Sequence, residues 1–266
     1  MKMLLRACGV AVAIALFHGA TVGWSFGVAL SSLLIGTTLV LACDSIEAAP
    51  RIEMVAILTW LYWGLSYVSN IIEALYFHVI PVLAAKRSVL GGLVIAVLAA
   101  CISVWLAPAK SREQIHRARI ASHLWWRIPL LALLFFVIYL SAGIAINPWI
   151  KSFYQNRPLP SLGDLAALQF CRGLLDVACI FPLSRRWAYS RERAAWLSVC
   201  VFTVLCGWGP LWLPNRFLPA PIRLAHGVEM GASGIAFGII TTMLLLKPVS
   251  AKSAEIARID RDRLVV

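Results

Sequence analysis

Eight stretches of about 20 apolar residues occupy most of this 266-residue chain. A helix of about 20 residues crosses the hydrocarbon core of a bilayer. Because lipid offers no hydrogen bonds to the backbone, such segments must be helical. Charged residues make up 14% of the chain, against about 25% in soluble domains. This excludes a soluble enzyme, a disordered chain, a coiled coil and a nucleic-acid-binding module. We predict an all-α transmembrane bundle with spans over 7–24, 27–43, 54–80, 89–108, 128–147, 164–183, 195–213 and 223–246.

Two interpretations fit the first two predicted spans: a hairpin of two retained helices, or a signal peptide followed by one helix. Residues 7–43 carry no charge, and the glycines at Gly23 and Gly27 would suit a tight hairpin between two short spans. Lys2 and Arg6 before an apolar run also resemble a secretory signal peptide, which would be cleaved near Ala20. We favour two retained spans because the next apolar run follows without a polar segment.

The distribution of basic residues predicts the orientation of the bundle. With eight spans and a cytoplasmic N-terminus, 17 of the 24 Lys and Arg residues fall in inner segments, 5 in outer segments and 2 within or at the edge of spans. The positive-inside rule therefore favours cytoplasmic N- and C-termini. Residues 1–247 then form a single membrane domain and 248–266 a cytoplasmic tail, and we expect the membrane to be a bacterial inner membrane. The loop around Asp44, Glu47 and Glu53 is unusually acidic for an inner loop.

The net charge of +12 follows from this orientation signal and from attraction to anionic lipid. We therefore expect the lipid bilayer as a partner and no nucleic acid. The sequence does not indicate an oligomeric state. The seven cysteines lie within or at the ends of apolar spans and form no C-x-x-C pair, which favours buried thiols over a metal or disulfide framework.

Three predicted spans carry polar residues at helical spacing. Such residues are costly in hydrocarbon and commonly mark functional sites. Each set lies on one face of its helix, so we predict that the three faces meet. The sets are Ser66, Ser69, Asn70 and Glu73 in span three; Gln169, Arg172 and Asp176 in span six; and Arg223, His226, Glu229 and Ser233 in span eight.

The predicted topology places most of these residues at one depth. Span three runs outward and spans six and eight run inward, so the polar groups gather in the outer half of the bilayer. His18 of span one comes out on the same side. Spans four and seven carry no charge within their apolar stretches, and we expect them to form the lipid-facing periphery.

These residues favour a site that binds or transports an ion or a small polar ligand. Glu73 and Glu229 would bind a proton or a cation, with His226 as the titrating partner. Arg172 and Arg223 would suit an anionic group, which makes an anionic ligand our first expectation. Asn70, Gln169 and Asp176 complete the predicted binding or proton-coupling set.

Two other functions fit the same residues. His226-x-x-Glu229 has the i, i+3 spacing of carboxylate metal sites in helical bundles, so Glu73 and His18 could complete a divalent metal site for a membrane-embedded hydrolase. The sequence requires no cofactor, and no nucleophile elbow marks a catalytic residue. Alternatively, the charges form ion pairs that only fix helix packing, as in an assembly protein.

Three strings resemble sequences in small polytopic bacterial membrane proteins of unassigned function. They are Phe170-x-Arg172-Gly173-Leu174-Leu175, the run from Pro214 to Pro219, and Arg223-x-x-His226-x-x-Glu229. The resemblance covers about the last 120 residues and implies no activity. Size and span count are also similar to the CAAX-protease-like intramembrane enzymes, but Glu73 has no adjacent glutamate and no arginine four residues later, so their motif is missing.

Overall fold

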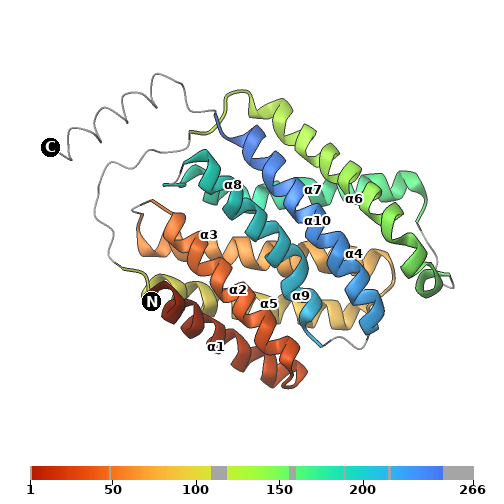
Figure 1. The fold of residues 1–266 in the computed structure, drawn as a ribbon, viewed down its shortest axis with the longest axis horizontal. Helices are drawn as coiled ribbons and strands as arrows, with labels where there is room; N and C mark the ends of the chain where they lie inside the picture. The colour runs from red at the N-terminus through yellow and green to blue at the C-terminus, as the bar shows by residue number, and fades with distance from the viewer. Residues whose placement is uncertain are drawn as a thin grey trace.

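The structure is a computed structural model, and it describes residues 2–47, 49–108, 119–155, 160–188, 190–214 and 217–247. Within them, 8 helical segments are long and apolar enough to cross a membrane, which confirms the predicted all-α bundle (Figure 1). Five spans are single helices: α1 (Lys2–Val22), α2 (Phe26–Ser45), α5 (Val82–Trp105), α6 (Leu124–Tyr154) and α7 (Leu162–Arg185). A sixth is α10 (Ala220–Leu245). The predicted tail, 248–266, and most of the loop between α5 and α6 lie outside the described residues.

The remaining two spans each contain a π-helical segment. Span three consists of α3 (Arg51–Trp63), η1 (Gly64–Ser69) and α4 (Asn70–Tyr76). Span seven consists of α8 (Arg191–Cys200), η2 (Val201–Trp208) and α9 (Gly209–Trp212). The two π segments pack against each other. A π-helix replaces the regular i→i−4 bonding pattern and is frequent at functional sites.

The turn between α1 and α2 explains how two short spans fit into 7–43. Gly23 has a φ of 87°, a left-handed conformation that favours glycine. Ser25 then caps α2 by accepting a hydrogen bond from the Val28 amide at 3.2 Å. At Gly27 an added Cβ would collide with the Trp212 carbonyl oxygen, so this position must be small. The hairpin that the glycines predicted is present.

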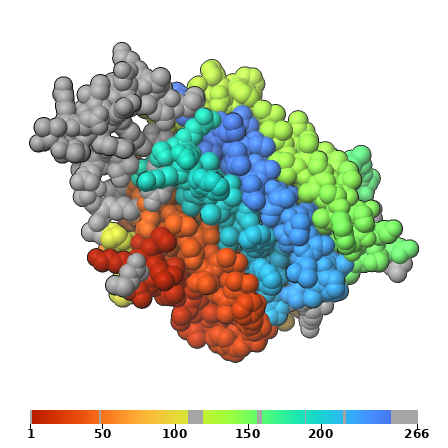
Figure 2. All heavy atoms as spheres, viewed as in Figure 1, coloured from red at the N-terminus to blue at the C-terminus, as the bar shows by residue number. Residues whose placement is uncertain are grey.

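Span seven lies inside the bundle, contrary to the prediction that it faces lipid. In its most apolar stretch 67% of the residues are buried, the highest share among the eight spans, whereas α6 has 11%. α10 lies between α8 and α6 (Figures 1 and 2). Span seven has no charged side chain in its apolar stretch, but its backbone carbonyls accept hydrogen bonds from other helices. Ser31 of α2, for example, donates to the Gly209 carbonyl at 2.7 Å.

The ends of the spans predicted to be cytoplasmic are tied together by backbone and ionic contacts. The Glu47 amide donates to the Arg186 carbonyl at 2.7 Å, and the Ala188 amide donates to the Ser45 carbonyl at 2.8 Å. Arg6 forms an ion pair with Asp44 at 2.8 Å, and Arg186 forms one with Glu53 at 2.6 Å. Asp44 and Glu53 of this acidic loop are thus neutralised by basic residues of neighbouring segments.

Candidate functional site

Arg172 is the centre of a buried polar cluster between α4 and α7. Its Nη1 lies 2.8 Å from Glu73 Oε2 and donates to Gln169 Oε1 at 2.8 Å. Gln169 Nε2 in turn donates to Glu73 Oε1 at 3.2 Å. The polar faces of spans three and six therefore meet, and Gln169 holds both members of the ion pair.

The other nitrogens of Arg172 also have protein acceptors. Nη2 donates to Asn70 Oδ1 at 3.5 Å, and Nε donates to Ser69 Oγ at 3.4 Å. The side chain is 2% exposed, and its guanidinium lies 5.7 Å from the centroid of the Phe135 ring. All three nitrogens are thus engaged within the protein, which leaves little of the guanidinium for an anionic ligand.

Asp176 lies one helical turn after Arg172 and is fully buried. The Cys206 thiol of η2 donates to its Oδ2 at 3.8 Å. Its Oδ1 has no hydrogen-bond partner among the described residues. The Ser69 hydroxyl and the Arg172 charge also act on this carboxylate, so Asp176 belongs to the Arg172 cluster, with one buried oxygen that accepts no hydrogen bond by distance and angle.

The second half of the cluster lies on α10. His226 Nδ1 is 2.6 Å from Glu229 Oε2, and Glu229 is 4% exposed. The other ring nitrogen, Nε2, lies 3.2 Å from the hydroxyl of Tyr154, at the end of α6. The imidazole thus connects a buried carboxylate to a partly exposed phenol.

Tyr139 of α6 connects the two halves. Its phenol interacts electrostatically with both Glu73 and Glu229. One turn later, Gly143 lies beside the Glu229 carboxylate: an added Cβ would be in ordinary van der Waals contact with Glu229 Oε1, at 3.7 Å. Sequence analysis missed Tyr139, although it is a polar-tipped residue in an otherwise apolar span, a signal that could have identified it.

The π segments position the residues of this cluster. Ser66 donates to the Leu205 carbonyl at 2.6 Å, and Asn70 donates to the Cys206 carbonyl at 2.8 Å. Backbone carbonyls in a membrane span need a donor from within the protein, and the side chains of span three supply donors to η2. Ser66 and Asn70 therefore fasten span seven, while Asn70 also accepts from Arg172.

Two candidate residues have partners elsewhere. Arg223 Nη1 donates to the Leu213 carbonyl at 2.9 Å, at the end of α9. His18 Nε2 lies 3.0 Å from the Tyr67 hydroxyl, and that hydroxyl is 3.4 Å from the Tyr62 hydroxyl. His18 therefore belongs to a different polar group, between α1 and η1.

The metal hypothesis gains no support from this geometry. In the part of the chain that the structure describes, no group of three or more His, Cys, Asp and Glu residues is arranged to hold a metal ion. Glu73 is paired with Arg172 and His18 with Tyr67, so neither joins His226 and Glu229 as a ligand.

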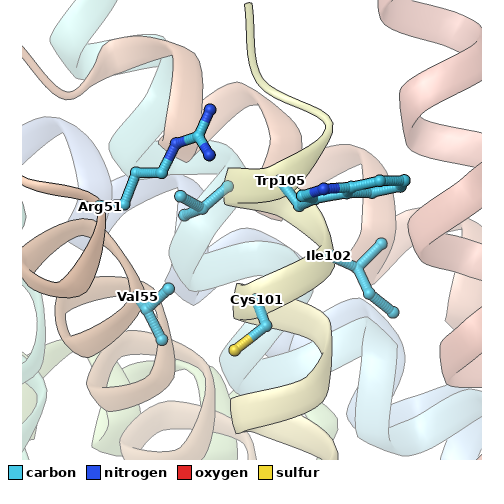
Figure 3. Close-up of a pocket in the computed structure, with 6 residues that line it drawn as sticks. Arg51, Val55, Cys101, Ile102 and Trp105 are labelled. Atoms are coloured by element: carbon cyan, nitrogen blue, oxygen red, sulfur yellow. The ribbon is translucent and has the colours of Figure 1, made fainter.

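A pocket of about 450 Å³ lies at a different place in the bundle. It is formed by the first turns of α3 and the last turns of α5, with Arg51, Val55, Cys101 and Trp105 around it (Figure 3). Glu73 lies at the opposite end of span three. The pocket is open and mostly apolar, in contrast to the buried polar cluster.

Comparison with known proteins gives a limited result. The chain is 30% identical over 166 residues to a protein of Solibacter usitatus (strain Ellin6076) described as "UPF0182 protein". The match covers 60% of this chain but 18% of that relative's length. No family model matches the chain, and no solved structure matches it. The geometry of the cluster therefore carries the functional argument.

Proposed function

We propose that this integral membrane protein binds a proton or a small monovalent cation at the cluster of Glu73, Arg172, Asp176, His226 and Glu229, and moves that ion across the membrane. The observation that carries the proposal is the buried Glu229–His226 pair, which is connected to Tyr154 on one side and faces Tyr139 on the other. Carboxylates inside membrane helices are typical of ion and proton pathways.

The charge of the cluster supports a cation rather than the anion expected from the sequence. Three carboxylates face one arginine and one histidine. Even with the imidazole protonated, one negative charge lacks a positive partner. A buried charge is costly unless it is compensated, and a bound proton or metal cation would supply the missing charge.

The buried Asp176 carboxylate, whose Oδ1 accepts no hydrogen bond from the described residues, supports the same conclusion. A cation or an added proton would use this acceptor, whereas an anion would be repelled by it. Arg172 then has a structural part in the site: it holds Glu73, Asn70 and Gln169 in place.

The proposal is tested in proteoliposomes loaded with a pH-sensitive dye or, separately, with a sodium-sensitive dye. A potassium gradient with valinomycin supplies the driving potential. We expect wild-type vesicles to take up protons or Na⁺ faster than protein-free vesicles, and Glu229→Gln to reduce the rate at least about tenfold, as loss of a group acting in proton transfer does. The matched control is Glu192→Gln, which removes the same charge from an exposed residue of α8.

Two results would overturn the proposal. One is a flux equal to that of protein-free vesicles for both ions, together with a melting temperature that does not respond to pH, Na⁺, K⁺ or Li⁺. The other is a Glu229→Gln protein that keeps the wild-type flux. A Glu229→Gln protein that only melts earlier would assign the cluster to helix packing.

A further inference from the structure

Basic side chains surround the C-terminal end of α10. Arg127 of α6 donates from Nη1 to the Leu244 carbonyl at 2.8 Å. Arg191 of α8 donates from Nη2 to the Met243 carbonyl at 3.0 Å. Because α10 lies between α6 and α8 (Figure 1), the two arginines reach this end of α10 from the two neighbouring helices. Each of them uses one N–H group to satisfy a terminal carbonyl.

Both arginines are half-buried and bring positive charge to this end of α10. Their Nε atoms are buried and have no hydrogen-bond partner among the described residues, so a bound anion would be held through the charge and the terminal nitrogens of the two side chains. Arg119 and Lys247 lie at the same end, joined by a hydrogen bond from the Lys247 amide to the Arg119 carbonyl at 2.8 Å, and both side chains are exposed. The neighbouring carboxylate on α8 is Glu192, so among the residues that the structure describes positive charge prevails at this end.

The surface next to these charges is apolar. Ile235, Ile239 and Met243 are exposed at four-residue spacing along α10, which forms a stripe on one face of a helix. α10 itself lies at the surface between α6 and α8 (Figure 2). Trp126, beside Arg127, is 39% exposed, and tryptophan is typical of the level of lipid headgroups.

We propose that this end of α10, between Arg127 and Arg191, binds the phosphate headgroup of an anionic phospholipid. The acyl chains lie along Ile235, Ile239 and Met243, and the guanidinium groups donate to the phosphate oxygens. Basic pockets between membrane helices suit such headgroups. This site is separate from the Arg172 cluster and does not depend on its function.

The test is native mass spectrometry of the full chain in detergent, titrated with phosphatidylglycerol or with phosphatidylethanolamine. We expect phosphatidylglycerol to bind preferentially. Arg127→Gln/Arg191→Gln should weaken its binding about 30-fold, as expected for two cationic side chains near a headgroup. Arg127→Lys/Arg191→Lys keeps the charges and should retain most of the affinity. The matched control, Lys86→Gln/Arg87→Gln, removes two exposed charges from α5 and should bind like wild type.

A second variant tests the site without breaking a helix cap. Met243 is 57% exposed and lies near the end of α10, where Arg191 donates to its carbonyl, so Met243→Glu should leave both caps intact while placing a carboxylate at this end of the helix. We expect it to abolish the preference for phosphatidylglycerol. Wild-type binding by this variant, equal weakening in the α5 control, or equal binding of the two lipids would overturn the proposal. Competition by inorganic phosphate at equal concentration would also do so, since it would assign the site to a soluble anion.

Discussion

At the scale of single residues, the Arg172–Glu73 pair determines how the polar cluster is held. Arg172 is enclosed by acceptors from α4 and from its own helix, so its charge is compensated without water. A buried charge that loses its partner is strongly destabilising, whereas loss of both partners costs much less. The difference between these two stability costs distinguishes a buried ion pair from two charges that are solvated separately.

We predict that Arg172→Met lowers the free energy of unfolding by about 3–5 kcal/mol, because it leaves Glu73 and Asp176 without a positive neighbour. Adding Glu73→Gln to this variant should recover part of the loss. The measurement is a double-mutant cycle from denaturant unfolding in detergent. Additive effects of the two substitutions would show that the side chains are energetically independent.

A second residue-scale prediction concerns the carbonyls of η2. Ser66→Ala should cost about 1–3 kcal/mol, the penalty for a buried carbonyl without a donor, because it leaves the Leu205 oxygen without its 2.6 Å hydrogen bond. Ser141→Ala is the control: its hydroxyl donates within its own helix on an exposed surface, so its thermal stability should stay near wild type. Equal losses in both variants would contradict the role assigned to Ser66.

At the scale of elements, α10 and span seven approach each other through glycines. At Gly238 an added Cβ would lie 2.6 Å from the Val199 amide nitrogen, and at Gly234 it would lie 2.7 Å from Thr203 Cα. Small residues permit this close packing of membrane helices. The contact positions α10, and therefore Glu229, against the π-helical part of span seven.

We predict that Gly238→Ala destabilises the protein by about 1–3 kcal/mol, because the methyl group meets backbone atoms that cannot move aside. Gly227→Ala on the same helix has nothing within 4 Å. It should be neutral or slightly stabilising, since alanine favours helix more than glycine does. Melting temperatures of both proteins in the same detergent provide the comparison, and a harmless Gly238→Ala would refute this packing.

The sequence predicted the membrane spans well, but it did not predict the π segments or which span lies at the centre of the bundle. Hydropathy predicted eight spans, and helical periodicity predicted that the faces with Asn70, Glu73, Gln169 and Arg172 would meet. The π segments could not be predicted, because a change of hydrogen-bond register leaves no mark on composition. The central place of span seven was missed for the same reason: its polarity resides in backbone carbonyls that Ser66 and Asn70 satisfy. Tyr139 was missed because the polar faces were identified from charged residues, and residues 128–147 carry none.

At the scale of the whole molecule, the loops fall on two sides of the membrane: those that follow an even number of spans lie on one side, and those that follow an odd number lie on the other. The contacts between 45–47 and 186–188, and between 119–121 and 245–247, join segments on one side of the bundle. This agrees with an even number of spans between the segments that are joined. The charge distribution predicts that this side faces the cytoplasm.

Cysteine labelling tests that orientation. In a background with Cys8, Cys101 and Cys171 replaced by Ala, we expect Ser122→Cys to react with a membrane-impermeant maleimide only after cells are permeabilised. Ser88→Cys, at the other side of the bundle, should react in intact cells. Both serines are exposed. The reverse pattern would invert the topology.

The length and exposure of α6 have a consequence for how the buried carboxylates exchange with their surroundings. The helix has 31 residues, about 46 Å at 1.5 Å per residue, against a hydrocarbon core of about 30 Å. It must therefore tilt or project, and 11% of its most apolar stretch is buried. Since Tyr139, Gly143 and Tyr154 of this helix cover Glu229 and His226, its tilt governs how closely they are covered. We expect bilayer thickness, through the angle of this one largely exposed helix, to set how readily the carboxylates gain or lose an ion.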